Sequence, residues 1–249
     1  MLILLTNDDG IYADGLLSLE KELRRIADVI LVAPDREQSA SSHSLTLTRP
    51  LRLHARGEKR HICDGTPTDC VMLAVHGLLK HKLPDLLISG INHGGNMGED
   101  VTYSGTVAAA IEGSILGIPS IAVSNTDSEN NKSFVAAARF IARFVRQVDK
   151  LDLPVETFLN INLPRLKNRG YDKYRFTRLG KRVYQDIIIE KTDPRGKNYY
   201  WIAGKSTWSR VEGSDFEAVS SGYVSISPLR LDFTDYGAIE LMNRQKFRI

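Results

Sequence analysis

The chain begins with five consecutive apolar residues, Met1 to Leu5, which run directly into the polar turn Thr-Asn-Asp-Asp-Gly. An uninterrupted apolar run of this length is typical of a strand that is buried on both faces in the middle of a parallel sheet. Such a strand needs helices on both sides, and it delivers the residues after it to the carboxyl edge of the sheet, where open α/β sheets bind ligands. This opening stretch therefore predicts an α/β fold and the place of its site.

Helical and strand patterns alternate from this strand as far as Leu163. Helical spacing of apolar residues predicts helices over 15–27, 67–79 and 133–150 and a further helix that starts near Val107. Apolar runs predict strands at 28–33, 83–90, 118–124 and 158–163, and short alternating segments predict a β-hairpin within 45–59. We expect a Rossmann-like, doubly wound, mostly parallel α/β sheet, but the first turn lacks the G-x-G-x-x-G fingerprint of nicotinamide or flavin binding.

The last third of the sequence is richer in β-forming residues. Segments 183–191 and 199–204 flank a turn at 192–196 and predict a long hairpin, 222–228 predicts a strand, and 236–245 predicts a closing helix capped by Thr234 or Asp235. We therefore expect two parts. Residues 1–172 form a Rossmann-like catalytic core whose sheet is complete at Pro164, and residues 173–249 form a β-hairpin, an oligomerisation region and the closing helix.

The expected hairpin carries more large apolar side chains than a free arm should expose. They are Ile187, Ile188, Ile189, Tyr199, Tyr200 and Trp201. Because two strands alone are marginal in water, we expect copies of the chain to exchange these arms and form a homodimer or homotetramer through the 183–204 hairpin. The alternative is a hairpin that folds back onto its own core.

The composition excludes several classes of partner. Of the 249 residues, 42% are hydrophobic and 25% charged, and the formal net charge of +3 is spread along the chain. Neither a nucleic-acid partner nor a membrane segment is expected from this pattern. The two cysteines, Cys63 and Cys70, lack metal-pair spacing and are too few for a disulfide framework, so we expect buried thiols in a cytoplasmic protein.

The adjacent carboxylates Asp8 and Asp9 are the first candidates for a site. Two neighbouring carboxylates repel each other, and desolvating them without a partner is costly, so a divalent metal ion between them is the economical arrangement. The alternative is a plain strand-to-helix turn with a capping Asp or Asn. The polar loop 34–44 follows the second predicted strand and reaches the same edge, which makes Ser39 and His43 candidate ligands or phosphate contacts, although a solvated loop is the more frequent outcome.

Two further segments reach this edge. The loop 91–98 holds three of its eight positions as glycine and offers amide groups from Asn92 and Asn96, which suit a metal ion and a phosphate group, although a flexible turn explains it equally well. Ser104, Gly105 and Thr106 begin the helix that follows, and N–H groups at a helix start with two hydroxyls form a phosphate cradle. The helix start at Thr66 and Pro67 also resembles an anion site, but capping explains it better.

Five motifs in this order resemble those of the SurE family, the survival proteins of bacteria and archaea. They are Thr-Asn-Asp-Asp-Gly, Val-Ala-Pro-Asp-Arg-Glu-Gln-Ser-Ala, Gly-Thr-Pro-Thr-Asp-Cys, Ser-Gly-Ile-Asn-His-Gly-Gly-Asn-Met-Gly and Tyr-Ser-Gly-Thr-Val-Ala-Ala-Ala. The resemblance implies metal-dependent dephosphorylation of nucleoside monophosphates, with broader phosphatase and short-chain polyphosphatase activity in some members. Matched motif by motif, it implies metal ligands and phosphate contacts. The metal ligands are Asp8, Asp9, Ser39 and Asn92, and the phosphate contacts are Asn96, Ser104, Gly105 and Thr106.

An all-oxygen ligand set favours Mg²⁺ or Mn²⁺ over zinc, and we expect one ion per subunit. We assign Asp8, Asp9 and Asn96 as the catalytic residues of a 5′-nucleotidase, with 3′-nucleotidase and exopolyphosphatase activity as extensions. Whether Asp8 attacks phosphorus or only holds the metal stays open. The rival functions are a receiver-type Mg²⁺-binding signalling module, which would need an acceptor aspartate where Asn92 stands, and a nucleotide-binding protein without turnover.

Overall fold

The computed structural model describes residues 1–80, 82–127, 131–165, 170–184, 188–202 and 206–245. Most of its strands join one nine-stranded sheet in the order β3-β4-β2-β1-β5-β6-β7-β13-β8. The first predicted strand is β1 (Leu2–Thr6), and it is fully buried in the middle of the sheet between β2 (Asp28–Pro34) and β5 (Leu86–His93), both parallel to it. Two more parallel strands follow, β6 (Ser120–Asn125) and β7 (Phe158–Leu163). The mostly parallel α/β sheet is confirmed.

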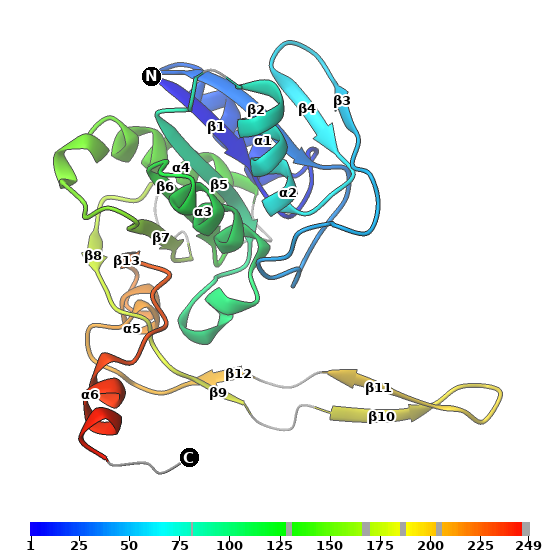
Figure 1. Cartoon of the computed structure of the whole chain (residues 1–249), viewed down its shortest axis with the longest axis vertical. Helices are drawn as coiled ribbons and strands as arrows, with labels where there is room; N and C mark the ends of the chain where they lie inside the picture. Colours follow the sequence, from blue (N-terminus) through cyan, green and yellow to red (C-terminus); the bar gives the residue numbers. More distant parts are fainter. Residues whose placement is uncertain (81, 128–130, 166–169, 185–187, 203–205, 246–249) are drawn as a thin grey trace.

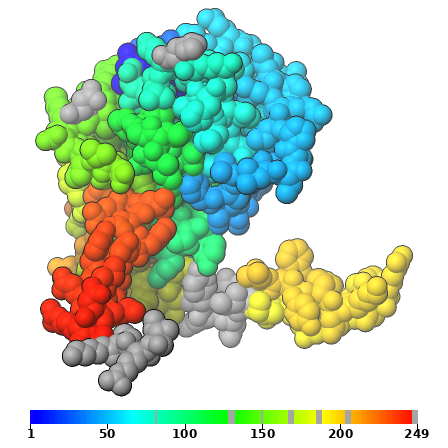
Figure 2. Space-filling model, in the orientation of Figure 1, coloured from blue at the N-terminus to red at the C-terminus, as the bar shows by residue number. Residues whose placement is uncertain are grey.

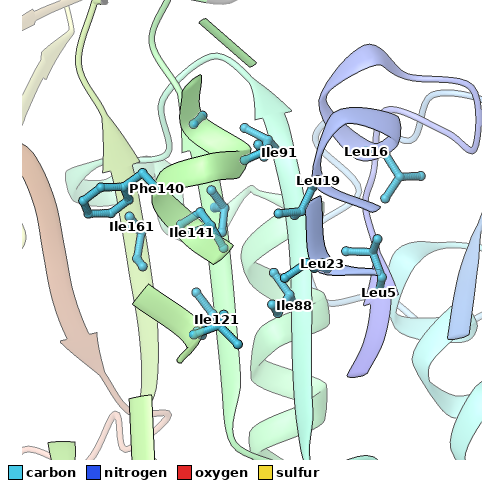
Figure 3. Close-up of a cluster of buried hydrophobic side chains, with 14 of the residues drawn as sticks. Leu5, Leu16, Leu19, Leu23, Ile88, Ile91, Ile121, Phe140, Ile141 and Ile161 are labelled. Atoms are coloured by element: carbon cyan, nitrogen blue, oxygen red, sulfur yellow. The ribbon is translucent and has the colours of Figure 1, made fainter. Parts of the chain in front are cut away.

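Helices cover both faces of the sheet, as a doubly wound fold requires (Figure 1). On one face α1 (Asp14–Leu23) packs with α4 (Asn131–Val145) over the larger apolar cluster, in which Leu23 of α1 lies beside Ile88 of β5 (Figure 3). On the other face α2 (Pro67–Met72), its π-helical continuation Leu73–Leu78 and α3 (Gly105–Ile115) pack over a second cluster. Short 3₁₀ turns lie at Gly98–Thr102 and Val148–Leu151.

The predicted start of α2 is confirmed in detail. The Thr66 hydroxyl accepts a hydrogen bond from the Asp69 N–H at 3.1 Å, and the Asp69 carboxylate accepts one from the Thr66 N–H at 2.9 Å. This reciprocal capping box, with Pro67 at the first helical position, satisfies two N–H groups at the helix start. The Thr66 hydroxyl and the Asp69 carboxylate are thereby occupied, which supports a structural role for these two side chains.

The hairpin expected within 45–59 is displaced toward the C-terminus. It consists of β3 (Leu53–Ala55) and β4 (Arg60–Cys63), and β4 also pairs in parallel with β2. The segment before this hairpin lies beside the start of α2 and is hydrogen-bonded to it. Thr46 N–H donates to the Asp69 carboxylate, and the Thr66 hydroxyl donates to the Ser44 carbonyl. These long-range bonds give the 45–52 backbone an alternative to strand pairing.

The expectation that the sheet is complete at Pro164 is wrong. A strand from the last part of the chain, β13 (Val224–Leu229), pairs antiparallel with β7, and β8 (Tyr174–Phe176) pairs in parallel with β13. The short helix α5 (Asp215–Ser220) packs against β13. The sequence predicts the β13 strand but not its partner, because pairing between distant segments leaves no local pattern. The division of the chain at 172/173 stays a prediction.

The predicted long hairpin is present as an arm (Figure 1). Its base pairs β9 (Arg182–Tyr184) with β12 (Ser206–Trp208), and its outer part pairs β10 (Ile188–Thr192) with β11 (Asn198–Ile202). Every residue of β10 and β11 is exposed, and the arm projects from the body of the molecule (Figure 2). It does not fold back onto its own core. Residue Ile187 and positions 185, 186, 203 and 204 of the expected 183–204 segment lie outside the described residues.

The chain ends its described part with α6 (Tyr236–Arg244), close to the predicted closing helix. Asp235, one of the two expected caps, accepts a hydrogen bond from the Ala238 N–H at 2.8 Å. No residue of α6 is buried. Within the described parts of the chain, no helix has the length and apolar character needed to cross a membrane.

Candidate metal and phosphate site

Asp8 lies in the tight turn that follows β1. The turn is fixed by hydrogen bonds from the Asn7 amide to the Gly10 carbonyl at 3.0 Å and from the Gln38 N–H to the Asp8 carbonyl at 2.7 Å. Gly10 has a φ of 96°, a left-handed conformation that costs a glycine nothing. The Asp8 side chain is buried, and its carboxylate accepts a hydrogen bond from the Thr106 hydroxyl at the start of α3. The central strand and α3 thus meet at this carboxylate.

The environment of Asp8 opposes its ionisation. The pKa of Asp8 is raised from 3.8 to about 6, mainly by burial; the charge of Asp9 also raises it, and hydrogen bonds from the hydroxyl and N–H of Thr106 lower it in part. Desolvation is the largest of these effects because a carboxylate loses water that only charged or hydrogen-bonding partners can replace. At neutral pH the ionised Asp8 is therefore a high-energy group that a cation would stabilise.

Asp9, the second member of the acidic pair, is half-buried. Its carboxylate accepts a hydrogen bond from the His93 N–H at 3.1 Å, which connects it to the end of β5. Desolvation raises the pKa of Asp9, the nearby His93 lowers it, and the charge of Glu37 raises it. Both members of the acidic pair thus have raised pKa values, and both are held by backbone groups of neighbouring strands or helices.

Ser39 lies on the exposed loop after β2, as predicted. Its hydroxyl donates to the Glu37 carboxylate at 2.5 Å. Ser39, Glu37 and Asp9 line one cavity of about 390 Å³ at the carboxyl edge of the sheet. The structure therefore brings Ser39 to the same side of the site as Asp9.

Asn92 and Asn96 have different surroundings although both come from the predicted glycine-rich loop. Asn92 belongs to the end of β5, beyond an irregularity in its pairing with β6, and its amide donates to the Gly94 carbonyl at 2.9 Å. Asn96 is buried, and its amide donates to the Ser124 hydroxyl at 2.8 Å. The Asn96 backbone is held from β7, since Asn162 accepts from its N–H and both Asn160 and Asn162 donate to its carbonyl. Asn96 is therefore a rigid group above β6 and β7.

The start of α3 is in direct contact with Asp8. A Cβ atom on Gly105 would lie 2.8 Å from the Ser41 hydroxyl and 2.9 Å from the Asp8 Cβ, so only glycine fits there without movement. The Ser104 hydroxyl caps the helix by accepting from the Val107 N–H at 3.1 Å. The side chain of Thr106 is fully buried. Both hydroxyls expected to hold phosphate are thus already engaged, one with the helix and one with Asp8.

The loop after β2 is held against α3 and against the segment just before this helix. Ser42 N–H donates to the Tyr103 carbonyl at 3.1 Å, and the His43 ring lies 2.7 Å from the buried Glu112 carboxylate, two turns into the helix. His43, a sequence candidate for ligand or phosphate contact, therefore bonds to α3 and acts as a clamp on this loop. The hydroxyl of Ser41, the residue just before Ser42, is buried and has no hydrogen-bond partner among the described residues.

The donor groups at this edge fit a hard divalent cation. The described residues contain no cluster of three or more His, Cys, Asp or Glu side chains that could hold a metal, so an ion here needs neutral oxygen ligands beside Asp8 and Asp9. Ser39 and Asn92 supply a hydroxyl and an amide oxygen near the same strand ends. Two carboxylates and two neutral oxygens would together make a ligand set of the kind that Mg²⁺ and Mn²⁺ prefer.

Comparison with known proteins identifies the family. The family model described as Survival protein SurE matches residues 3–186. The chain is 48% identical to the 5′-nucleotidase SurE of Geotalea daltonii over 98% of both chains, and 49% identical to that of Geobacter metallireducens over 99% of this chain and 98% of the relative. The protein belongs to the SurE family. The crystal structure of the SurE protein from Aquifex aeolicus is similar with a TM-score of 0.88 and 43% identity, covering 98% of this chain and 99% of the other.

The structure of this SurE chain also reveals supporting residues that the sequence interpretation missed. Asn160 and Asn162 are fully buried and hold the backbone of Asn96 in place. Glu37 accepts a hydrogen bond from Ser39, and its charge raises the pKa of Asp9. A signal for the two asparagines is present, because Asn-Ile-Asn places two amides on one face of an otherwise apolar buried strand. No comparable pattern marks Glu37. The bond between Thr106 and Asp8 leaves no local pattern either, because it joins segments far apart in the sequence.

Asp8 is expected to destabilise the metal-free SurE fold at neutral pH. Its folded pKa of about 6 exceeds the unfolded value of 3.8, so its contribution is favourable at low pH and is lost as the pH rises through that interval. Two pKa units correspond to roughly 3 kcal/mol, which is an upper bound. With a chelator present, Asp8→Asn should raise the free energy of unfolding at pH 7.5 by about 1–3 kcal/mol. Urea titrations at pH 4.5 and 7.5 measure this, and equal pH dependence in both proteins would contradict it.

Thr106 and Asn96 are expected to differ in their effect on metal binding. Thr106→Val removes the hydroxyl that orients Asp8, and loss of such a supporting bond typically costs about tenfold or more in metal affinity or activity. Asn96→Ala should lower the turnover rate and leave metal affinity unchanged, because its amide bonds to Ser124. Calorimetry with Mn²⁺ beside steady-state kinetics tests the difference, with Thr106→Ser as the control that keeps the hydroxyl. Full metal affinity in Thr106→Val would refute the supporting role.

Proposed function

We propose that this protein hydrolyses nucleoside monophosphates to nucleoside and phosphate in a metal-dependent reaction at the Asp8–Asp9 edge of the sheet. The 5′-nucleotidase activity follows from its family and from relatives of that name that match nearly its whole length. The observation that supports this edge as the site is the buried, ionisable Asp8, with a pKa raised to about 6 beside a second carboxylate. A fold keeps such a costly arrangement where a cation and a charged substrate use it.

In this proposal Asp8 and Asp9 are the anionic metal ligands, and Ser39 and Asn92 are the neutral ones. A bound Mg²⁺ or Mn²⁺ ion would neutralise phosphate oxygens and lower the pKa of a water molecule. Other residues of the chain hold the two carboxylates in place. Thr106 and His93 donate hydrogen bonds to the two carboxylates and so fix their positions. We propose one ion per subunit.

The phosphate group is assigned to the start of α3 and to Asn96. Gly105 brings the first turn of α3 against Asp8, so a phosphate near the metal also lies near the positive end of the helix dipole. Ser104, Thr106 and the rigid Asn96 complete the proposed phosphate contacts. In the reaction water forms the new bond to phosphorus, the ester bond breaks, and the nucleoside leaves with a proton on its hydroxyl oxygen.

Phosphate release is the direct test of this function. A panel of nucleoside mono-, di- and triphosphates, 3′-monophosphates and short polyphosphate, each assayed with Mg²⁺ and Mn²⁺ and with a chelator, would define the substrate and the metal. We expect the highest kcat/KM for nucleoside 5′-monophosphates, and we expect no phosphate release when the chelator is present. Metal-dependent binding of these nucleotides without phosphate release would instead support a non-hydrolytic binding protein.

We further propose that the protein is a cytoplasmic homodimer or homotetramer that assembles through the arm. Both cysteines are free and buried, which suits a reducing compartment. The arm exposes Ile188, Ile202 and Trp201 at 61%, 82% and 62%, and side chains of this size are normally covered by a partner surface. A second copy offers the same arm and can cover it symmetrically.

A further inference from the structure

The cavity beside Asp9 contains more than its candidate metal ligands. Its walls come from the turn after β1, the loop after β2 and the end of β5. The lining residues are Asp9, Gly10, Ile11, Tyr12, Ala13, Asp35, Arg36, Glu37, Ser39 and His93. A volume of about 390 Å³ falls in the range of small-molecule sites. The metal and phosphate assignments use only two of its residues, so most of the cavity has no role in them.

Tyr12 presents an aromatic ring at this cavity. The side chain is 72% exposed, although its backbone is held firmly. Ile11 N–H donates to the Pro34 carbonyl at 3.0 Å, and Ala13 N–H donates to the Gly10 carbonyl at 3.1 Å. A fixed backbone with an exposed ring gives a flat apolar surface that binds a planar partner at low entropic cost.

The charge of the cavity favours a neutral occupant. Three carboxylates, from Asp9, Asp35 and Glu37, line it against one guanidinium, from Arg36. That guanidinium is exposed and lies 3.9 Å from the Asp35 carboxylate. A chain of further phosphates would be repelled here even after one metal ion had bound, whereas an uncharged nucleoside would not. The exposed face of the Arg36 guanidinium is of the kind that stacks on an aromatic base.

We propose that this cavity binds the nucleoside part of the substrate, with the base stacked on the ring of Tyr12. The inference rests on the proposed function and adds to it the part of the site that recognises the base. In this proposal the phosphate lies toward Asp8 and α3, and the nucleoside lies in the cavity beside Asp9. The stacking is tolerant of base identity because every base presents an aromatic face.

The test compares two substrates that share the phosphate and differ in the base. KM is measured for adenosine 5′-monophosphate and for glycerol phosphate in wild type, Tyr12→Ala and Tyr12→Phe. Loss of one stacked ring costs roughly tenfold, so Tyr12→Ala should raise the KM for the nucleotide about tenfold and leave that for glycerol phosphate unchanged. Tyr12→Phe should behave as wild type, because it keeps the ring.

Tyr103→Ala is the matched control. Tyr103 is also exposed, at 57%, and lies between the 3₁₀ turn Gly98–Thr102 and α3. It does not line the cavity. Its loss should leave the ratio of the two KM values unchanged. An unchanged nucleotide KM in Tyr12→Ala, an equal rise for both substrates, or the selective rise in Tyr103→Ala instead would overturn the proposal.

Failure of this inference is distinguishable from failure of the nucleotidase function. A wild-type protein that releases no phosphate from any nucleotide refutes the function. The cavity is then tested by calorimetry with adenosine alone, whose binding should weaken about tenfold in Tyr12→Ala. Adenosine binding that does not respond to this substitution would refute the cavity assignment as well.

Discussion

Replacement of Asp8 or Asp9 by Asn is expected to reduce metal-dependent phosphate release on the order of a thousandfold, or about 4 kcal/mol of transition-state stabilisation. Each substitution removes one of the two charges that hold the cation and leaves the shape of the side chain almost unchanged. The fold should survive, because neither carboxylate contributes to an apolar cluster. Steady-state kinetics with saturating Mg²⁺ or Mn²⁺, beside thermal unfolding, measures both effects.

Asp14→Asn is the matched control for these variants. It removes the same charge from the exposed start of α1, a few residues along the chain. Its rate should stay close to that of wild type. Near-normal turnover in Asp8→Asn or Asp9→Asn would show that the cation, if one is needed, is held elsewhere. A comparable loss in Asp14→Asn would show that the effect is not specific to the pair.

Removal of the outer arm is expected to convert the assembled protein into monomers. A variant that replaces residues 186–203 with a short Gly/Ser linker loses β10 and β11 and with them the exposed apolar side chains, while the nine-stranded sheet keeps all its strands. Light scattering at micromolar concentration should give the mass of a single chain. The proposed metal site is at the strand ends of the body, so metal binding should persist.

A point variant separates the arm from general surface effects. Trp201 pairs across the hairpin with Ile189, and Trp201→Ser should weaken the assembly. Leu47→Ser is its control, since Leu47 is 85% exposed on the body of the protein. An intact oligomer in the arm deletion, or a wild type that is monomeric at the same concentration, would exclude assembly through the arm.

Local patterns predict most of the central fold. The buried β1 strand, the leucine spacing of α1 and the capping box at Thr66 are each encoded within a few residues, and all three are present. The pairing of β13 with β7 and of β8 with β13 is not encoded locally. It depends on which distant edge each segment meets, so the sequence does not show that the sheet continues past Pro164.

The candidate site is likewise predictable only where the signal is local. Strand ends predict that Asp8, Asp9, Ser39 and Asn92 gather at one edge, because parallel strands deliver their following residues to the same side. The partner of each group could not be predicted. Thr106 belongs to a helix start whose spacing suits phosphate equally well, and its bond to Asp8 depends on how closely α3 approaches β1. Those assignments remain predictions that the variants above test.

The position of β13 has a consequence for synthesis of the chain. β7 ends at Leu163, but its second neighbour in the sheet is formed by residues that follow the arm and α5. During translation β7 is therefore an edge strand with one side unpaired, able to bind other strands, until Leu229 has left the ribosome. The arm is made earlier, while this edge is still open. A nascent chain stalled within the arm would expose both the open side of β7 and the apolar side chains of the arm, and completion of β13 covers the first of these surfaces.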